Sequence, residues 1–155
     1  SVTVANRPGV LSRITGLFSR RNFNINSLSV GETENPEFSR MTIEVNGDSR
    51  VLDQVVKQLN KLIEVIKIDE LDRKNIVDRD LALIRVKSTR ETRSEIIQIV
   101  NTFRGKIVDI STDSLMIEAT GTVSKIEALI ELLKDFGIED IVRTGIVALN
   151  RGVIS

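Results

Sequence analysis

The chain has 155 residues, of which 41% are hydrophobic, and its 22 Lys and Arg side chains balance 22 Asp and Glu side chains. Balanced charge and a set of aromatics limited to five Phe argue against nucleic-acid binding. The absence of His and Cys removes the commonest general base, the commonest metal ligand and thiolate chemistry. No run approaches the ~18 apolar residues of a membrane-spanning helix. We therefore expect a cytoplasmic protein that is not an enzyme and has no catalytic residues, metal site, membrane contact or nucleic-acid partner.

The first half of the chain predicts the element order β-α-β-β-α-β. Apolar residues from Val10 to Phe18 recur at helical spacing, and Asn22 is expected to end that helix because Asn tolerates left-handed geometry. The next strand should contain a bulge between Ile25 and Leu28, where its apolar residues change parity. Alternation and turn residues predict strands over 1–5, 23–30, 38–46 and 63–71, and helices over 10–21 and 49–62.

The second half of the chain repeats this plan. The most charged stretch between periodic segments, 72–80, is predicted to be a linker between domains 1–74 and 75–155. Its carboxylates and Glu70 could instead gather a divalent cation, but linkers are normally charged and we favour the linker. Strands are predicted over 81–87, 106–111, 115–120 and 138–149, and helices from Thr89 or Thr92 to Phe103 and from Gly121 to Gly137. The predicted fold class is α+β, with two tandem ferredoxin-like βαββαβ domains.

The loop that enters the first helix has the features of a receptor for a small amino acid. A ligand carboxylate binds well to backbone N–H groups at a helix N-terminus, and a glycine without Cβ lets the ligand approach the backbone. Amide side chains on the loop and the following strand can donate and accept, and apolar neighbours can form a wall. The candidate site residues are Asn6, Gly9, Val10, Leu11, Asn24 and Ile25. The structural alternative is that Asn6 caps the helix and Gly9 permits a tight turn.

Several longer motifs run through both halves of the chain. The first half carries Asn6-x-x-Gly9-Val10-Leu11-Ser12-Arg13, Gly16-Leu17-Phe18, Arg21-Asn22-Phe23-Asn24-Ile25-x-Ser27-Leu28 and Ser39-Arg40-Met41-Thr42-Ile43. The second half carries Phe103-Arg104-Gly105-Lys106-Ile107-Val108-Asp109, Arg143-Thr144-Gly145 and Arg151-Gly152. Together these motifs closely resemble the regulatory (small) subunits of acetolactate synthase, also called acetohydroxyacid synthase.

The resemblance implies an amino-acid-sensing ACT domain at 1–74 and an ACT-like C-terminal domain at 75–155. It implies that two ACT domains of a homodimer or higher oligomer bind a branched-chain amino acid, usually valine. The loop residues Asn6, Gly9, Val10 and Leu11 would come from one chain, and Asn24 and Ile25 from its neighbour.

The resemblance also implies a partner, the catalytic large subunit of acetolactate synthase. The chain would activate that subunit and confer feedback inhibition by valine on it, in branched-chain amino-acid biosynthesis. Thiamine diphosphate, Mg²⁺ and FAD would bind only to the partner, with no cofactor in this chain. The alternative function is a free-standing ACT-type amino-acid sensor or oligomerisation module that acts on another partner.

Overall fold

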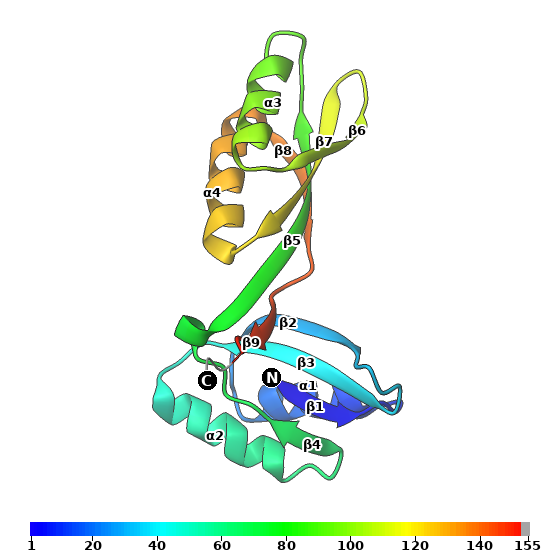
Figure 1. The fold of residues 1–155 in the computed structure, drawn as a ribbon, viewed down its shortest axis with the longest axis vertical. Helices are drawn as coiled ribbons and strands as arrows, with labels where there is room; N and C mark the ends of the chain where they lie inside the picture. Colours follow the sequence, from blue (N-terminus) through cyan, green and yellow to red (C-terminus); the bar gives the residue numbers. More distant parts are fainter. Residues whose placement is uncertain (153–155) are drawn as a thin grey trace. The chain divides into compact units, whose positions relative to one another are not determined.

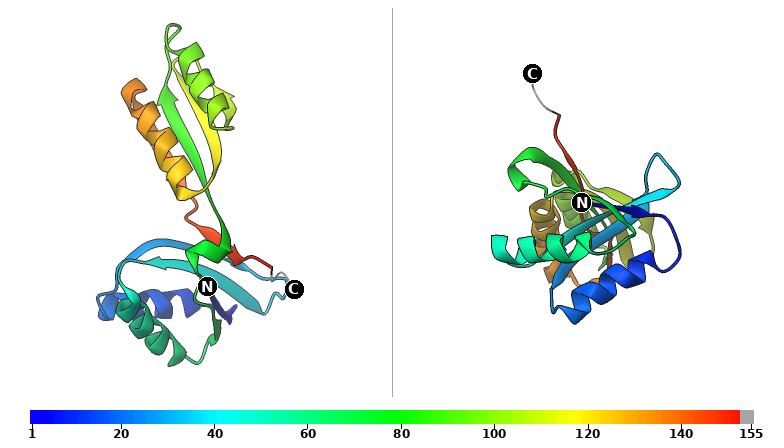
Figure 2. Two further views of the ribbon diagram at one scale, coloured as in Figure 1. Left: turned by 60° about the vertical axis from the view of Figure 1, so that its left-hand side comes forward. Right: turned by 90° about the horizontal axis from the view of Figure 1, so that it is seen from below.

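The computed structural model describes residues 1–152 and groups them into two compact units. The first unit contains residues 1–77 together with the C-terminal residues from Ile146, and the second contains residues 78–145. Each unit has its own apolar core. Figures 1 and 2 show that each unit consists of one sheet with two helices packed beside it. Among residues 1–152, no helix is both long enough and apolar enough to cross a membrane.

The first unit has the strand order of a ferredoxin-like sheet. Its elements are β1 (Val2–Ala5), α1 (Val10–Arg20), β2 (Ile25–Glu32), β3 (Phe38–Val45), α2 (Ser49–Asn60), β4 (Val65–Ile68) and β9 (Val147–Asn150). Four strands form an antiparallel sheet in the order β2-β3-β1-β4. Both helices cover the same face of this sheet (Figure 1). The predicted α+β class is therefore confirmed for this unit.

Local sequence signals account for the elements of the first unit. The buried face of α1 consists of Val10, Ile14, Leu17 and Phe18, the spacing that predicted the helix. Asn22 follows α1 with φ 58°, the left-handed geometry expected of the residue that ends the helix. The predicted bulge is also present, since the register of β2 against β3 shifts between Ile25 and Ser27.

The second unit repeats the same architecture. Its elements are β5 (Ile76–Lys87, which begins in the first unit), α3 (Arg93–Thr102), β6 (Lys106–Ile110), β7 (Ser114–Gly121), α4 (Val123–Leu133) and β8 (Ile138–Arg143). The sheet order is β6-β7-β5-β8, and α3 and α4 lie on one face of it (Figure 2). Alternate residues of β5 (Ala82, Ile84 and Val86) are fully buried against these helices.

The segment between the two predicted domains differs from the expected linker. Residues 73–75 form a short 3-10 helix, and β5 begins directly after it at Ile76. The last predicted strand is divided into β8 and β9, and β9 pairs with β5. The Ile146 backbone N–H donates to Ser27 Oγ at 2.9 Å, and Ile146 is 7% exposed. These contacts group the C-terminal residues from Ile146 with the first unit, whereas the prediction gave all of 75–155 to the second domain.

Candidate functional site

Asn6 holds the loop between β1 and α1 against the turn between β2 and β3. Its backbone N–H donates to the Glu37 carbonyl at 2.8 Å. Its side-chain Nδ2 donates to the Pro36 carbonyl at 2.9 Å and to Glu32 Oε1 at 3.2 Å. Asn6 therefore does not cap α1, so this part of the structural alternative is wrong. The amide uses its donors to position the loop.

Gly9 is the N-cap residue of α1 and has a left-handed backbone, with φ 86°. A side chain at this position would be strained, although nothing lies within 4 Å of a Cβ built there. Gly9 has no side chain with which to cap α1, and the first turn of the helix contains no acidic residue. The first-turn N–H groups have no acceptor within the helix and sit at the positive end of its dipole. This end of α1 is therefore suited to an anionic group.

The two apolar residues that follow Gly9 point in different directions. Val10 is 5% exposed and belongs to the core of the first unit. Leu11 is 45% exposed and lies on the flank of α1 next to the buried face. Leu11 therefore offers a largely exposed side chain to a ligand, whereas most of the Val10 side chain packs in the core.

Asn24 and Ile25 lie where the chain enters β2. Asn24 comes just before the strand, whereas the sequence placed it within the strand. Its carbonyl accepts from the Asn46 N–H at 3.1 Å. Its exposed amide makes one long hydrogen bond, to Asn26 Oδ1 at 3.4 Å. Ile25 is half-buried against the core. The Asn24 amide is thus exposed to solvent and is only weakly hydrogen-bonded.

Within one chain, the predicted loop residues and the predicted residues near the start of β2 lie at opposite ends of α1. The helix has 11 residues, which corresponds to a length of roughly 16 Å. The loop from Asn6 to Leu11 opens the helix, and Asn24 follows its C-terminal end. A single copy therefore does not bring the six predicted residues into one pocket.

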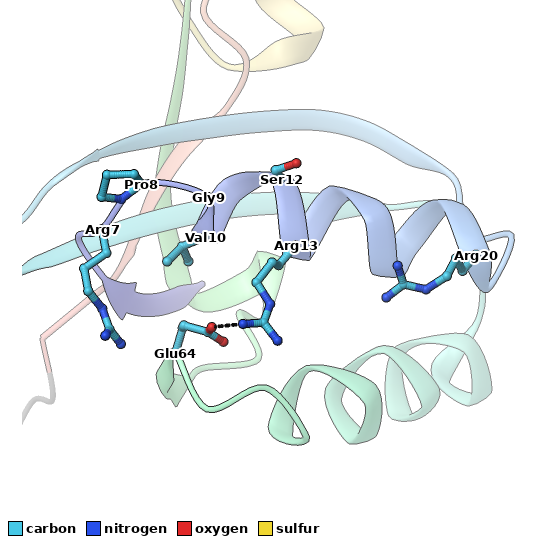
Figure 3. Close-up of a pocket in the computed structure, with 8 residues that line it drawn as sticks. All are labelled: Arg7, Pro8, Gly9, Val10, Ser12, Arg13, Arg20 and Glu64. Carbon is cyan, nitrogen blue, oxygen red and sulfur yellow. Dashed lines mark hydrogen bonds and ion pairs between the residues drawn. The ribbon is translucent and has the colours of Figure 1, made fainter.

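A hollow of about 470 Å³ lies beside the N-terminal half of α1 and is shown in Figure 3. It contains only two of the predicted residues, Gly9 and Val10. We call it the arginine hollow, and its lining residues are Arg7, Pro8, Gly9, Val10, Ser12, Arg13, Arg20 and Glu64. Arg13 and Arg20 are seven residues apart and thus share a helical flank, which the sequence already signals. Glu64 approaches from the turn before β4, a contact that no local pattern reveals.

The strongest charged cluster of the second unit is structural. Arg143 donates to Asp80 and also from Nη1 to Glu127 Oε1 at 2.6 Å. Burial works to lower the pKa of Arg143, but hydrogen bonds to Glu127 and Asp80 outweigh it and raise that pKa. Asp80 is one of the carboxylates considered for a cation site. In the described part of the chain, no three such side chains gather in a way that could hold a metal ion.

Taken together, the repeated ferredoxin-like fold and the glycine-containing loop at the α1 N-terminus define a protein of the ACT class. Family models match both halves of the chain and support this class. Residues 1–67 match the AHAS small subunit-like ACT domain, and residues 79–152 match the small subunit of acetolactate synthase. The chain therefore belongs to the family of acetolactate synthase small subunits.

Individual relatives are similar in sequence to this chain along nearly its whole length. The acetolactate synthase small subunit of Mycolicibacterium smegmatis is 55% identical over 98% of this chain and 89% of its own length. The probable acetolactate synthase small subunit of Archaeoglobus fulgidus is 53% identical over 98% of this chain and 95% of its own. The crystal structure of the small subunit from Thermotoga maritima has a TM-score of 0.92 and 47% identity, over 99% of this chain and 96% of that one.

Proposed function

We propose that this chain is a non-catalytic regulatory subunit that binds valine between two of its copies and controls a catalytic subunit of acetolactate synthase. Its relatives are named small subunits of that enzyme, which supports a catalytic large subunit as the partner. The large subunit would carry the thiamine diphosphate, Mg²⁺ and FAD.

The single observation that carries this proposal is the placement of the predicted residues at opposite ends of both α1 and β2. The Asn6 amide donates to Glu32, at the end of β2, whereas Asn24 precedes the start of β2. In a two-fold pairing of β2 strands, antiparallel alignment brings the start of one strand beside the end of the other. Asn24 of one copy would then face the loop of its neighbour.

The composition of β2 favours this pairing. β2 is the edge strand of its sheet and contains no Lys, Arg or Pro, the residues that usually protect an edge from another chain. Val30 on this strand and Leu11 on α1 are 47% and 45% exposed. A second copy along β2 would cover such apolar groups.

In the assembled site, each part of valine would have a suitable partner. The carboxylate would accept hydrogen bonds from N–H groups of the first turn of α1, next to Gly9. The Asn24 amide oxygen of the other copy would accept from the ammonium group, and Leu11 would contact the side chain. Because the ligand would bridge two copies, its binding would be linked to the geometry of the dimer, and through it to the catalytic subunit.

The test is an assay of acetolactate formation by the catalytic large subunit of the same organism, with and without this chain. We expect the chain to raise the rate and L-valine to lower it again, whereas D-valine should have no effect. An unchanged rate and no response to L-valine would contradict the proposal. Stereoselective valine binding without association with the large subunit would favour the free-standing sensor instead.

A further inference from the structure

The arginine hollow adjoins the proposed valine site at Gly9 and extends from there along the flank of α1 opposite Leu11. Leu11 and Arg13 are two positions apart in the helix, which separates their directions by about 200°. Figure 3 shows Arg7 and Arg13 on either side of Glu64 in this view, with Arg20 further along the helix. The hollow therefore belongs to a single copy of the chain and does not need a partner to complete it.

Glu64 is a buried carboxylate with an unfilled position. The residue is 8% exposed, and its Oε1 forms an ion pair with Arg13. Its Oε2 is buried and has no hydrogen-bond partner in the described part of the protein. A buried oxygen of this kind is destabilising unless a donor reaches it. Glu64 lines the hollow, so a small rotation of its side chain would bring this oxygen to an O–H or N–H group of a bound molecule.

The other charges in the hollow are positive. Arg7 and Arg20 are exposed and form no ion pair with any residue from 1 to 152, whereas Arg13 is neutralised by Glu64. Arg20 Nη1 lies 3.5 Å from the position that a Cβ of Gly16 would take, so its side chain lies over this glycine. Three Arg and one Glu leave a formal charge of +2, and the uncapped N-terminus of α1 adds to it.

We propose that the arginine hollow binds a phosphate group, either inorganic phosphate or a phosphate monoester. The doubly charged oxyanion would accept hydrogen bonds from the Arg7 and Arg20 guanidinium groups, which are well matched to phosphate oxygens. A P–OH group, or a hydroxyl group beside the phosphate of an ester, would donate to Glu64 Oε2. The ligand would thus satisfy both the excess positive charge and the unpartnered buried oxygen.

The test is a titration of the full chain with inorganic phosphate at constant ionic strength, in the absence of valine. We expect saturable binding that the double variant Arg7→Gln/Arg20→Gln weakens about tenfold or more, since two charge-assisted contacts are lost. The matched control is Arg21→Gln/Lys57→Gln, which removes the same charge from two exposed positions outside the hollow, the C-cap of α1 and a residue of α2. Equal weakening in both double variants, or no saturable binding to the natural chain, would overturn the proposal.

A comparison of phosphate with sulfate tests the role of Glu64. Sulfate carries no proton to donate, so the natural chain should prefer phosphate, and Glu64→Gln should remove that preference because its amide donates instead. Equal affinity of the natural chain for both ions would overturn the proposal. Titration with glycerol phosphate distinguishes the two possible ligands. If glycerol phosphate binds as well as inorganic phosphate, the hollow accepts a phosphate monoester. If it does not bind, the ligand is inorganic phosphate. The valine response of Arg7→Gln/Arg20→Gln should be unchanged, so this test is independent of the proposed function.

Discussion

Arg143 and Asp80 form an ion pair that ties the end of β8 to β5. Arg143 Nε and Nη2 lie 2.9 and 2.5 Å from the same oxygen of Asp80, Oδ2. Asp80 is 2% exposed, whereas the Arg143 side chain is 29% exposed. The carboxylate thus depends on this guanidinium for most of the charge compensation that replaces water.

We therefore expect Arg143→Met to destabilise the second unit by about 3–5 kcal/mol, the range for leaving one member of a buried ion pair without its partner. Hydrogen exchange of amides in β5 and β8 would measure the loss for this unit alone. The control is Glu127→Gln, which removes the other partner of Arg143. Because the Glu127 side chain is 56% exposed, its loss should cost less than about 1 kcal/mol. Equal small losses in both variants would show that Asp80 does not depend on Arg143.

Features that arise within a few residues of sequence could be predicted. The periodicity of α1, the left-handed Asn22 and the bulge in β2 all follow from neighbouring side chains, and the structure confirms each of them. Asp48 accepts the Val51 N–H at the start of α2, at 3.1 Å, as is typical of an Asp that directly precedes a helix. Local chemistry is therefore sufficient to predict these positions.

Features that depend on long-range contacts could not be predicted. Asn6 resembles a helix cap in sequence, but its donors bind groups 26 and 30 residues away. Glu64 lies in a polar-looking turn, but it is 8% exposed and forms an ion pair with Arg13, 51 residues earlier. The return of β9 to the first unit likewise rests on partners such as Ser27, which is 119 residues from Ile146. In the arginine hollow, the shared flank of Arg13 and Arg20 follows from helical spacing, whereas the approach of Glu64 is a long-range contact.

Substitutions at Gly9 distinguish the effect of backbone strain on stability from the effect of an added side chain on ligand binding. Gly9→Ala should destabilise the first unit by about 1–2 kcal/mol, because a Cβ disfavours the left-handed backbone. Gly9→Asn should be better tolerated, since Asn adopts this geometry more readily. Both variants should lose the valine response, because both place a side chain where the ligand approaches. Thermal unfolding and the valine assay measure the two effects, and a full response in the stable Gly9→Asn variant would contradict the role of this glycine.

Self-association should depend on the β2 edge. Val30→Lys places a charge on this edge strand, at a side chain that is 47% exposed, and should shift the chain from dimer to monomer in analytical ultracentrifugation. Ile66→Lys is the matched control, because Ile66 is 55% exposed on β4, at the opposite edge of the same sheet. If Ile66→Lys disrupts association and Val30→Lys does not, the copies pair along β4 rather than β2.

Asn24 gives the most direct separation of ligand binding from folding. Its side chain is exposed, and its only hydrogen bond to residues 1–152 is the 3.4 Å bond to Asn26. Asn24→Ala should therefore change the free energy of unfolding by no more than about 0.5 kcal/mol. If Asn24 accepts a hydrogen bond from the ligand ammonium group, the same change should abolish saturable L-valine binding in calorimetry, because the buried ammonium would lack an acceptor.

Asn26→Ala is the matched control for this variant. It removes the same hydrogen bond from the other side, and its side chain is likewise exposed. It should leave both the unfolding transition and valine binding as in the natural chain. Loss of binding in both variants would mean that the pair orders the start of β2 without contacting the ligand. Retention of binding in Asn24→Ala would remove Asn24 from the site and, with it, the reason to assemble the site from two copies.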